Sequence, residues 1–115
     1  MIGKIVNVMM WSKDLERTRT WYKEKLGFRP TYHAPGEFLA MYSDSMGAIN
    51  FHATKDAAQI GNGPLPYFAV EDIEKTCAWL EQKGVKVNPI QQVSDSPKHT
   101  WFWDCEGNVL GIQGA

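Results

Sequence analysis

One segment of this chain occurs twice, and the repeat limits the folds that are open to it. Asp14–Gly27 reads DLERTRTWYKEKLG, and Asp72–Gly84 reads DIEKTCAWLEQKG. Asp, Glu, Thr, Trp and Lys recur at an offset of 72 − 14 = 58 residues, and one residue is lost just before the closing glycine. An offset near half of the 115 residues predicts one supersecondary unit used twice, because a solenoid needs three or more shorter repeats.

Length and composition fit one compact domain, because 115 residues that are 43% hydrophobic can bury a core. The net charge of −1 argues against nucleic acid or an anionic membrane as partner, since both call for a basic patch. No apolar run reaches the roughly 18 residues of a membrane span, and the N-terminus lacks the apolar core of a signal peptide. Cys77 and Cys105 have no metal-motif spacing, which predicts free thiols in a reducing cytoplasm.

The hydrophobic period predicts the same order of elements on either side of a linker at residues 55–64, which is rich in Gly, Asn and Pro. Asp14 is placed to cap the first helix and Gly27 to end it. The first module, residues 1–54, is predicted to hold a strand over 4–11, a helix up to residue 26, and strands over 28–33, 38–42 and 47–53. The second module, residues 65–115, is predicted to hold a strand over 65–70, a helix over 72–83, and strands over 86–93, 99–103 and 108–113.

Eight strands and two helices in this order predict an α+β fold of two tandem βαβββ modules. The sheets are mostly antiparallel, the helices cover one side of them, and the concave faces are free to form a cup. Period two places Asn7, Met9 and Trp11 on one face of the first strand. Asn50 and His52 share a face of the fourth strand.

Three parts of the sequence carry a family resemblance: Lys13–Thr18 with Trp21, Tyr22 and Leu26–Phe28, then Val70–Ile73, and finally Asp104–Gly111. With these motifs in this order, the sequence resembles the vicinal oxygen chelate superfamily, which holds glyoxalase I, bleomycin-resistance proteins and extradiol dioxygenases. The resemblance covers nearly the whole chain. One departure is Cys105, where the family usually has proline.

The resemblance implies four metal-ligand positions, from the first and last strand of each module, which fall here on Asn7, Asn50, Leu65 and Gly111. A catalytic zinc needs about three imidazole, thiolate or carboxylate ligands, and hard cations prefer carboxylates to neutral amides. Leu65 and Gly111 offer no side-chain donor. We therefore expect the family metal site to be absent and predict no cofactor.

The expected cup residues are mainly aromatic and amide side chains, and His52 is the one ionisable group among them. For Asn7 and Asn50 the alternative is a polar pair satisfied between two strands. For Trp11 the alternative is core filling, while Trp21 and Trp79 are expected in the core and Asp104 and Gly107 in turn geometry. Period two leaves open whether Trp101 and Trp103 or Phe102 face the cup. The predicted ligand-binding residues are Asn7, Met9, Trp11, Asn50, His52, Tyr67 and Gln113.

The leading hypothesis is a metal-free small-molecule binding protein, similar to the bleomycin-resistance branch, whose aromatic cup takes up an apolar or aromatic metabolite or drug. The alternative is a glyoxalase-like lyase or isomerase that uses a metal or acid/base chemistry at His52. A third hypothesis is an interaction module with a vestigial cup. Two exposed sheet faces with open edges, together with the resemblance, predict a homodimer.

Overall fold

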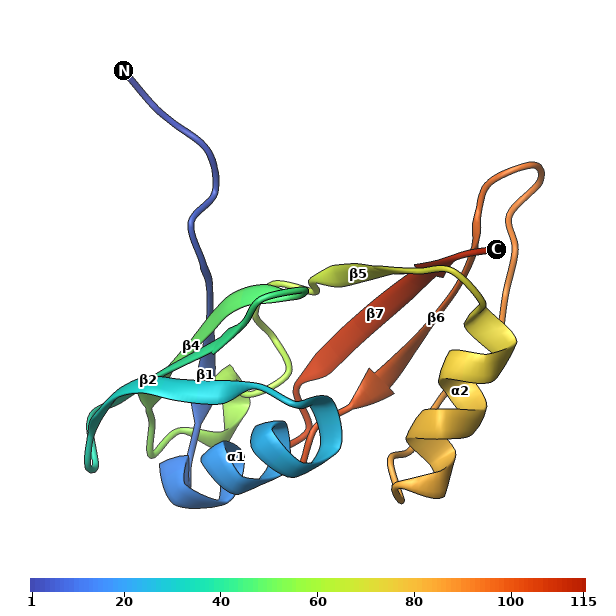
Figure 1. The fold of residues 1–115 in the computed structure, drawn as a ribbon. Coiled ribbons are helices and arrows are strands. Elements are labelled where there is room, and N and C mark those ends of the chain that lie inside the picture. Colours follow the sequence, from blue (N-terminus) through green and yellow to red (C-terminus); the bar gives the residue numbers. More distant parts are fainter.

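The computed structural model describes residues 1–115 and has the α+β architecture that the repeat predicts. Each of two sheets has a helix against one face, α1 under the first sheet and α2 beside the second (Figure 1). The first module holds β1 (Val8–Ser12), α1 (Leu15–Trp21), a π-helical turn η1 (Tyr22–Leu26), β2 (Arg29–Ala34), β3 (Phe38–Ser43) and β4 (Gly47–Ala53). After a 3-10 turn η2 (Ala57–Gln59), the second holds β5 (Tyr67–Val70), α2 (Ile73–Gln82), β6 (Lys98–Trp103) and β7 (Val109–Gly114). None of these helices has the length and apolarity that a membrane span needs.

The two sheets share one pairing scheme. The first has the order β1-β4-β3-β2 and the second β5-β7-β6, and in each the first and last strands of the module lie parallel while the other pairs are antiparallel. Met9 lies opposite Asn50 in the first parallel pair, and Tyr67 lies opposite Gly111 in the second. These positions differ by 67 − 9 = 58 and 111 − 50 = 61 residues. The repeat seen in the helices therefore extends to the strands.

The predicted strand over residues 86–93 is not formed, so the second sheet has three strands. Only two isolated bridges, Val87 with Phe102 and Gln91 with His99, join this segment to β6. Pro89 stands in the middle of the segment and has no N–H to donate, which interrupts the ladder. The chain therefore has seven strands, and the prediction of an eighth strand over residues 86–93 was wrong.

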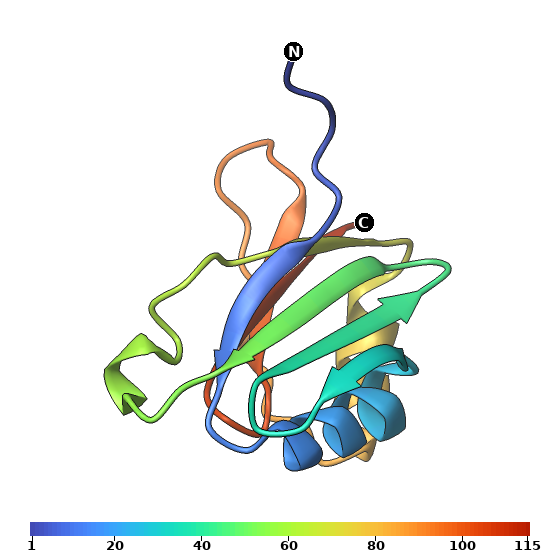
Figure 2. The same ribbon diagram turned by 90° about the vertical axis from the view of Figure 1, so that its left-hand side faces the viewer.

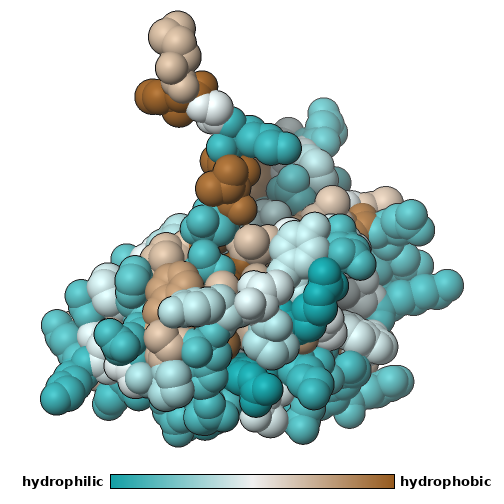
Figure 3. Space-filling model, turned by 60° about the vertical axis from the view of Figure 1, so that its left-hand side comes forward, coloured by the Kyte–Doolittle hydropathy of each residue, from teal (hydrophilic) through white to brown (hydrophobic).

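The first strand is also shorter than predicted, because β1 begins at Val8 rather than at residue 4. Its partner β4 begins at Gly47, two residues before the first paired residue Ile49, so a strand reaching back to residue 4 would outrun its partner. Residues 1–7 instead form an extended arm that leaves the body in both ribbon views (Figures 1 and 2). The arm carries apolar side chains that no part of the chain covers (Figure 3), namely Met1, Ile2, Ile5 and Val6.

The two helices begin alike, but only the first ends in a π-helical turn. Asp14 and Asp72 cap them by accepting a hydrogen bond from the backbone N–H three residues on. In the first module the helix continues from α1 into the π-helical turn η1, which ends at Gly27 with φ +80°. A π-helical turn accommodates one inserted residue. This turn therefore accounts for the residue by which the first copy of the repeat is longer.

One hydrophobic core lies between the helices and the helix-facing sides of both sheets. Phe102 belongs to it, so Trp101 and Trp103 lie on the other face of β6, which answers the question left open by period two. Trp21 is half-buried and packs against the core. Trp79 is 44% exposed, with the Lys83 ammonium 4.3 Å from its ring centroid. The prediction that Trp79 belongs to the core was wrong.

Candidate functional site

The face of the first sheet that is turned away from the core, its outer face, carries a row of rings. Alternate residues of β1, β4 and β3 are buried, which leaves Trp11, His52 and Phe38 on the outer face. These three lie in register, and the His52 ring centroid is 5.7 Å from that of Trp11 and 5.1 Å from that of Phe38. Met9 and Asn50 pair on the same face, both half-buried. Four of the seven predicted site residues are therefore neighbours here.

The outer face of the second sheet carries a comparable set around Gly111. Tyr67 on β5 and Trp101 on β6 lie opposite Gly111 from its two sides. His99, whose backbone pairs with Gln113, has its ring centroid 6.4 Å from that of Tyr67 and 6.5 Å from that of Trp101. Tyr67 and Gln113, the two site residues predicted in this module, thus share one face with two rings that were not on the predicted site list.

The seventh predicted residue, Asn7, does not join either face. It lies on the exposed arm, outside β1, so the structure corrects its placement within a strand on the cup face. None of the hollows of the single chain is lined by Trp11, His52, Tyr67 or Gln113. Both aromatic faces are therefore open in one chain.

The positions implied for a metal do not fit one. Asn7 is on the arm, Leu65 is 45% exposed and precedes β5, and Asn50 offers only an amide. At Gly111 an added Cβ would lie 2.6 Å from Tyr67 Cε2, so a ring covers the place of a fourth ligand. No three His, Cys, Asp or Glu side chains of the chain are grouped as a metal site would need. The donor set thus lacks the carboxylate, imidazole or thiolate ligands that a resident metal needs.

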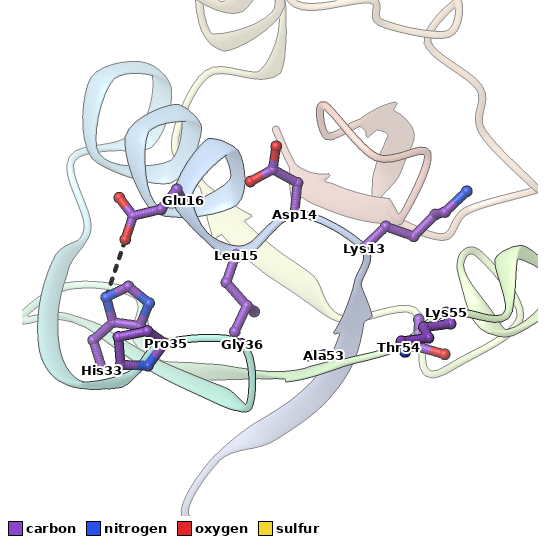
Figure 4. Close-up of a pocket in the computed structure, with 10 residues that line it drawn as sticks. All are labelled: Lys13, Asp14, Leu15, Glu16, His33, Pro35, Gly36, Ala53, Thr54 and Lys55. Atoms are coloured by element: carbon purple, nitrogen blue, oxygen red, sulfur yellow. Dashed lines mark ion pairs between the residues drawn. The ribbon is translucent and has the colours of Figure 1, made fainter.

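A polar hollow of about 490 Å³ lies between the start of α1, the β2–β3 turn and the end of β4 (Figure 4). On one wall His33 Nδ1 lies 3.3 Å from Glu16 Oε1, and His33 Nε2 is buried without a hydrogen-bond partner. Lys13 and Lys55 line the opposite wall in the close-up. Nε2 is buried away from solvent, so this wall presents to the hollow an imidazole whose Nδ1 contacts a carboxylate.

The two modules are joined by a buried polar network at the β6–β7 turn. Asp104 Oδ2 accepts hydrogen bonds from the Tyr22 hydroxyl at 2.7 Å and from Asn108 Nδ2 at 3.0 Å. Its Oδ1 accepts from the backbone N–H groups of Glu106 and Asn108. Burial raises the pKa of Asp104 while these bonds lower it, and burial and the nearby Asp104 raise the pKa of Tyr22 well above its ordinary value. Asn108 also donates to the Trp11 carbonyl at 2.9 Å, which ties the turn to the aromatic row.

The neighbouring Cys105 is not an activated thiol. Burial and the adjacent Asp104 raise its pKa to about 11, and its Sγ lies 3.9 Å from the Arg17 carbonyl. A thiol with so high a pKa is almost entirely protonated near neutral pH and is a poor nucleophile. Both cysteines are free, as the sequence predicts.

The sequence model of the Glyoxalase/Bleomycin resistance protein/Dioxygenase superfamily matches residues 4–109. This chain belongs to that superfamily. The vicinal oxygen chelate resemblance and the α+β fold are thereby confirmed. No curated protein matches the sequence.

Solved structures of the superfamily fold superimpose on nearly the whole chain. TnmS3, an antibiotic binding protein from Streptomyces sp. CB03234, is 21% identical with a TM-score of 0.78 over 98% of this chain and 96% of its own. Lactoylglutathione lyase from Agrobacterium tumefaciens is 12% identical with a TM-score of 0.79 over 99% and 95%. The fosfomycin resistance protein FosX from Listeria monocytogenes is 13% identical with a TM-score of 0.78 over 100% and 95%. At these identities the likeness shows the fold alone.

Sequence reasoning missed Phe38 as a member of the aromatic row and Asp104 as the junction of the modules. The signal for Phe38 was its place opposite His52, which becomes visible only when the register of β3 with β4 is known. For Asp104 the sequence gives only an Asp that begins a turn, and its partner Tyr22 is 82 residues away.

Proposed function

We propose that this member of the superfamily is a small-molecule binding protein whose aromatic sheet faces take up an apolar or aromatic metabolite or drug. The observation that carries the proposal is the row of Trp11, His52 and Phe38, which stands on a sheet face that no helix covers. Aromatic rings gathered on an open face offer large apolar area and favourable stacking geometry to a ligand. TnmS3, which has the same fold, is described as an antibiotic binding protein, and this supports the class of function.

We further propose that binding proceeds without the family metal. The support is chemical, since the positions implied for ligands hold two amides, a leucine and a glycine. Two free cysteines are consistent with a cytoplasmic protein, and a net charge of −1 with a small-molecule partner rather than nucleic acid or membrane.

Native mass spectrometry tests both parts of this proposal. The protein as purified, and again after dialysis against Zn²⁺, Ni²⁺ or Mn²⁺, should remain free of stoichiometric metal, and an organic adduct would identify a ligand by its mass. Trp11→Ala should then weaken that ligand at least tenfold. Trp79→Ala serves as the matched control, because Trp79 is 44% exposed on α2, on the core side of the second sheet and on neither outer face. Stoichiometric metal, or a ligand indifferent to Trp11→Ala, would contradict the proposal.

A second candidate is a lyase or isomerase, because His52 is exposed on the outer face with Asn50 two residues before it on the same side. In that case the imidazole would act as acid and base on a hydroxy-carbonyl substrate, with the amide orienting the carbonyl oxygen. Turnover of a hemithioacetal that His52→Ala abolishes would establish this reading. Turnover that survives the substitution would show that His52 is not the acid/base group.

We also propose that the chain forms a homodimer. The arm of residues 1–7 leaves Ile2 102%, Ile5 86% and Val6 73% exposed, and both aromatic faces are open in one chain. A second copy would bury these surfaces and close the cup. Light scattering should give a dimer for the full chain and a weaker dimer after deletion of residues 1–6. A full chain that stays monomeric at tens of micromolar would contradict it.

A further inference from the structure

On the second sheet, the ring of Tyr67 fills the space that a side chain at Gly111 would occupy. A Cβ built on Gly111 would lie 2.6 Å from Cε2, 2.7 Å from Cδ2 and 2.8 Å from Cγ of Tyr67. The ring therefore lies across the backbone of residue 111. No residue larger than glycine fits there while Tyr67 keeps its position, because such contacts are far inside van der Waals distance.

The equivalent pair in the first module is built differently. Met9 and Asn50 hold the same places in the pairing of β1 with β4, and both carry ordinary side chains. In the second module the pair is Tyr67, which carries a large ring, and Gly111, which has no side chain. The Tyr67 phenol therefore covers Gly111, a position at which the family resemblance implies a metal ligand.

The surroundings of Tyr67 fix its ring but leave its hydroxyl free. Gly111 lies beneath the ring, and the His99 ring centroid stands 6.4 Å away. Tyr22 donates its hydroxyl to Asp104, whereas the Tyr67 hydroxyl donates to no group of the chain, and the residue is 40% exposed. A phenol held by its ring on a strand is a preorganised hydrogen-bond donor, because little rotamer freedom is lost when a ligand binds.

We propose that Tyr67, seated by Gly111, is the specificity-determining donor through which the cup recognises an acceptor oxygen on an aromatic ligand. This inference rests on the proposed binding function and narrows it to flat aromatic molecules that carry a carbonyl group. The Tyr67 hydroxyl, at the edge of its ring, donates to the carbonyl oxygen of a ligand that lies edge-on to that ring. Trp101 and His99 form the rest of this wall.

A ring over a strand glycine also has a purely structural use, since it shields an otherwise bare backbone. That use requires the ring and not the hydroxyl. A test must therefore separate the two, which Tyr67→Phe does because it keeps the ring in place. Tyr42→Phe is the control for the loss of a phenol hydroxyl elsewhere in the cup, because Tyr42 shares the outer face of the first sheet with Phe38 and lies under Arg29.

Fluorene and 9-fluorenone are suitable probes, because they share a flat three-ring shape and differ by one carbonyl group. Tryptophan fluorescence of the full chain reports their dissociation constants. Tyr67→Phe should weaken fluorenone about five- to tenfold, as expected for one neutral hydrogen bond, and leave fluorene unchanged. Tyr42→Phe should change neither constant.

Three outcomes decide between the readings. Selective weakening of fluorenone by Tyr67→Phe supports the inference. Binding of both probes that Tyr67→Phe does not alter overturns the role of Tyr67 and leaves the binding function standing. Binding of neither probe overturns the aromatic cup itself and the inference with it.

Gly111→Ala gives an independent check that the Tyr67 ring lies against Gly111. The added methyl group should displace the ring and weaken both probes, with the fold verified by circular dichroism. In the parent protein the Gly111 Hα resonances should be shifted strongly upfield by the ring above them. Unshifted resonances, or probe binding that Gly111→Ala leaves intact, would show that Tyr67 is not held there.

Discussion

Removing one hydroxyl group at the module junction should destabilise the whole chain. In Tyr22→Phe the ring keeps its edge-on contacts with Phe28 and Phe51, at 5.8 and 4.9 Å between centroids, while Asp104 loses its 2.7 Å bond. Tyr22 is 0% exposed, so no water replaces the lost donor. All four hydrogen bonds of Asp104 are accepted ones, which suits a carboxylate, and a bond to a charged group is worth about 1.5–3 kcal/mol.

We therefore expect Tyr22→Phe to lower the free energy of unfolding by about 2 kcal/mol. With an unfolding entropy of about 2.1 cal/mol/K per residue, 115 residues give about 0.24 kcal/mol/K, so Tm should fall by about 8 °C. Urea denaturation and calorimetry measure the two quantities, with Tyr42→Phe as control. A double-mutant cycle with Asp104→Asn should show coupling, because each change removes the same bond. A loss below about 0.5 kcal/mol, or additive effects, would refute the role given to this bond.

Three further predictions concern single side chains. Burial raises the folded-state pKa of Asp104, so the stability that this group contributes is fully present below its unfolded pKa and is lost as pH rises through its folded pKa. The free energy of unfolding of the parent chain, minus that of Asp104→Asn, should therefore decrease from pH 3 upward. An increase of this difference with pH would show that the pKa of Asp104 is lowered in the folded state. Cys105, with a pKa of about 11, should react slowly with iodoacetamide at pH 7.5 and accelerate toward pH 10; fast alkylation at neutral pH in the folded protein would contradict its burial. Leu80→Ala should lower the free energy of unfolding by about 2–5 kcal/mol, and Trp79→Ala by much less, because Leu80 is 1% exposed and Trp79 is 44% exposed. Equal losses in urea denaturation would show that Trp79 contributes to the core as Leu80 does.

The repeat was sufficient to predict the fold because its information is local. Capping Asp, helix-ending Gly and period-two strands are read over windows of a few residues, and two copies support one another. The same windows place Trp11 and His52 on outward faces correctly. What they cannot supply is the pairing of distant strands, and so Phe38 was not recognised as the third ring of the row.

The wrong predictions come from interactions that a local pattern does not contain. Asn7 has strand-like neighbours, but the pairing of β1 with β4 begins only at Val8 and Ile49. Pro89 sits in a pattern of alternating residues whose ladder it interrupts. Trp79 matches Trp21 in the repeat, yet it lies mostly outside the core while its neighbour Leu80 is buried. In each case the tertiary surroundings decide against the periodic pattern.

In a chain made of two equal halves, a first half could in principle pair with the first half of a neighbouring molecule at no difference in free energy. The junction removes that ambiguity. At the positions equivalent to Tyr22 and Asp104 stand Leu80 (80 − 22 = 58) and Ser43 (104 − 43 = 61), which cannot form a phenol–carboxylate bond. An assembly that brought two first halves together would leave the hydroxyl of Tyr22 without its acceptor. One buried bond, present on one side of the pseudo-symmetry only, thus encodes which half must meet which.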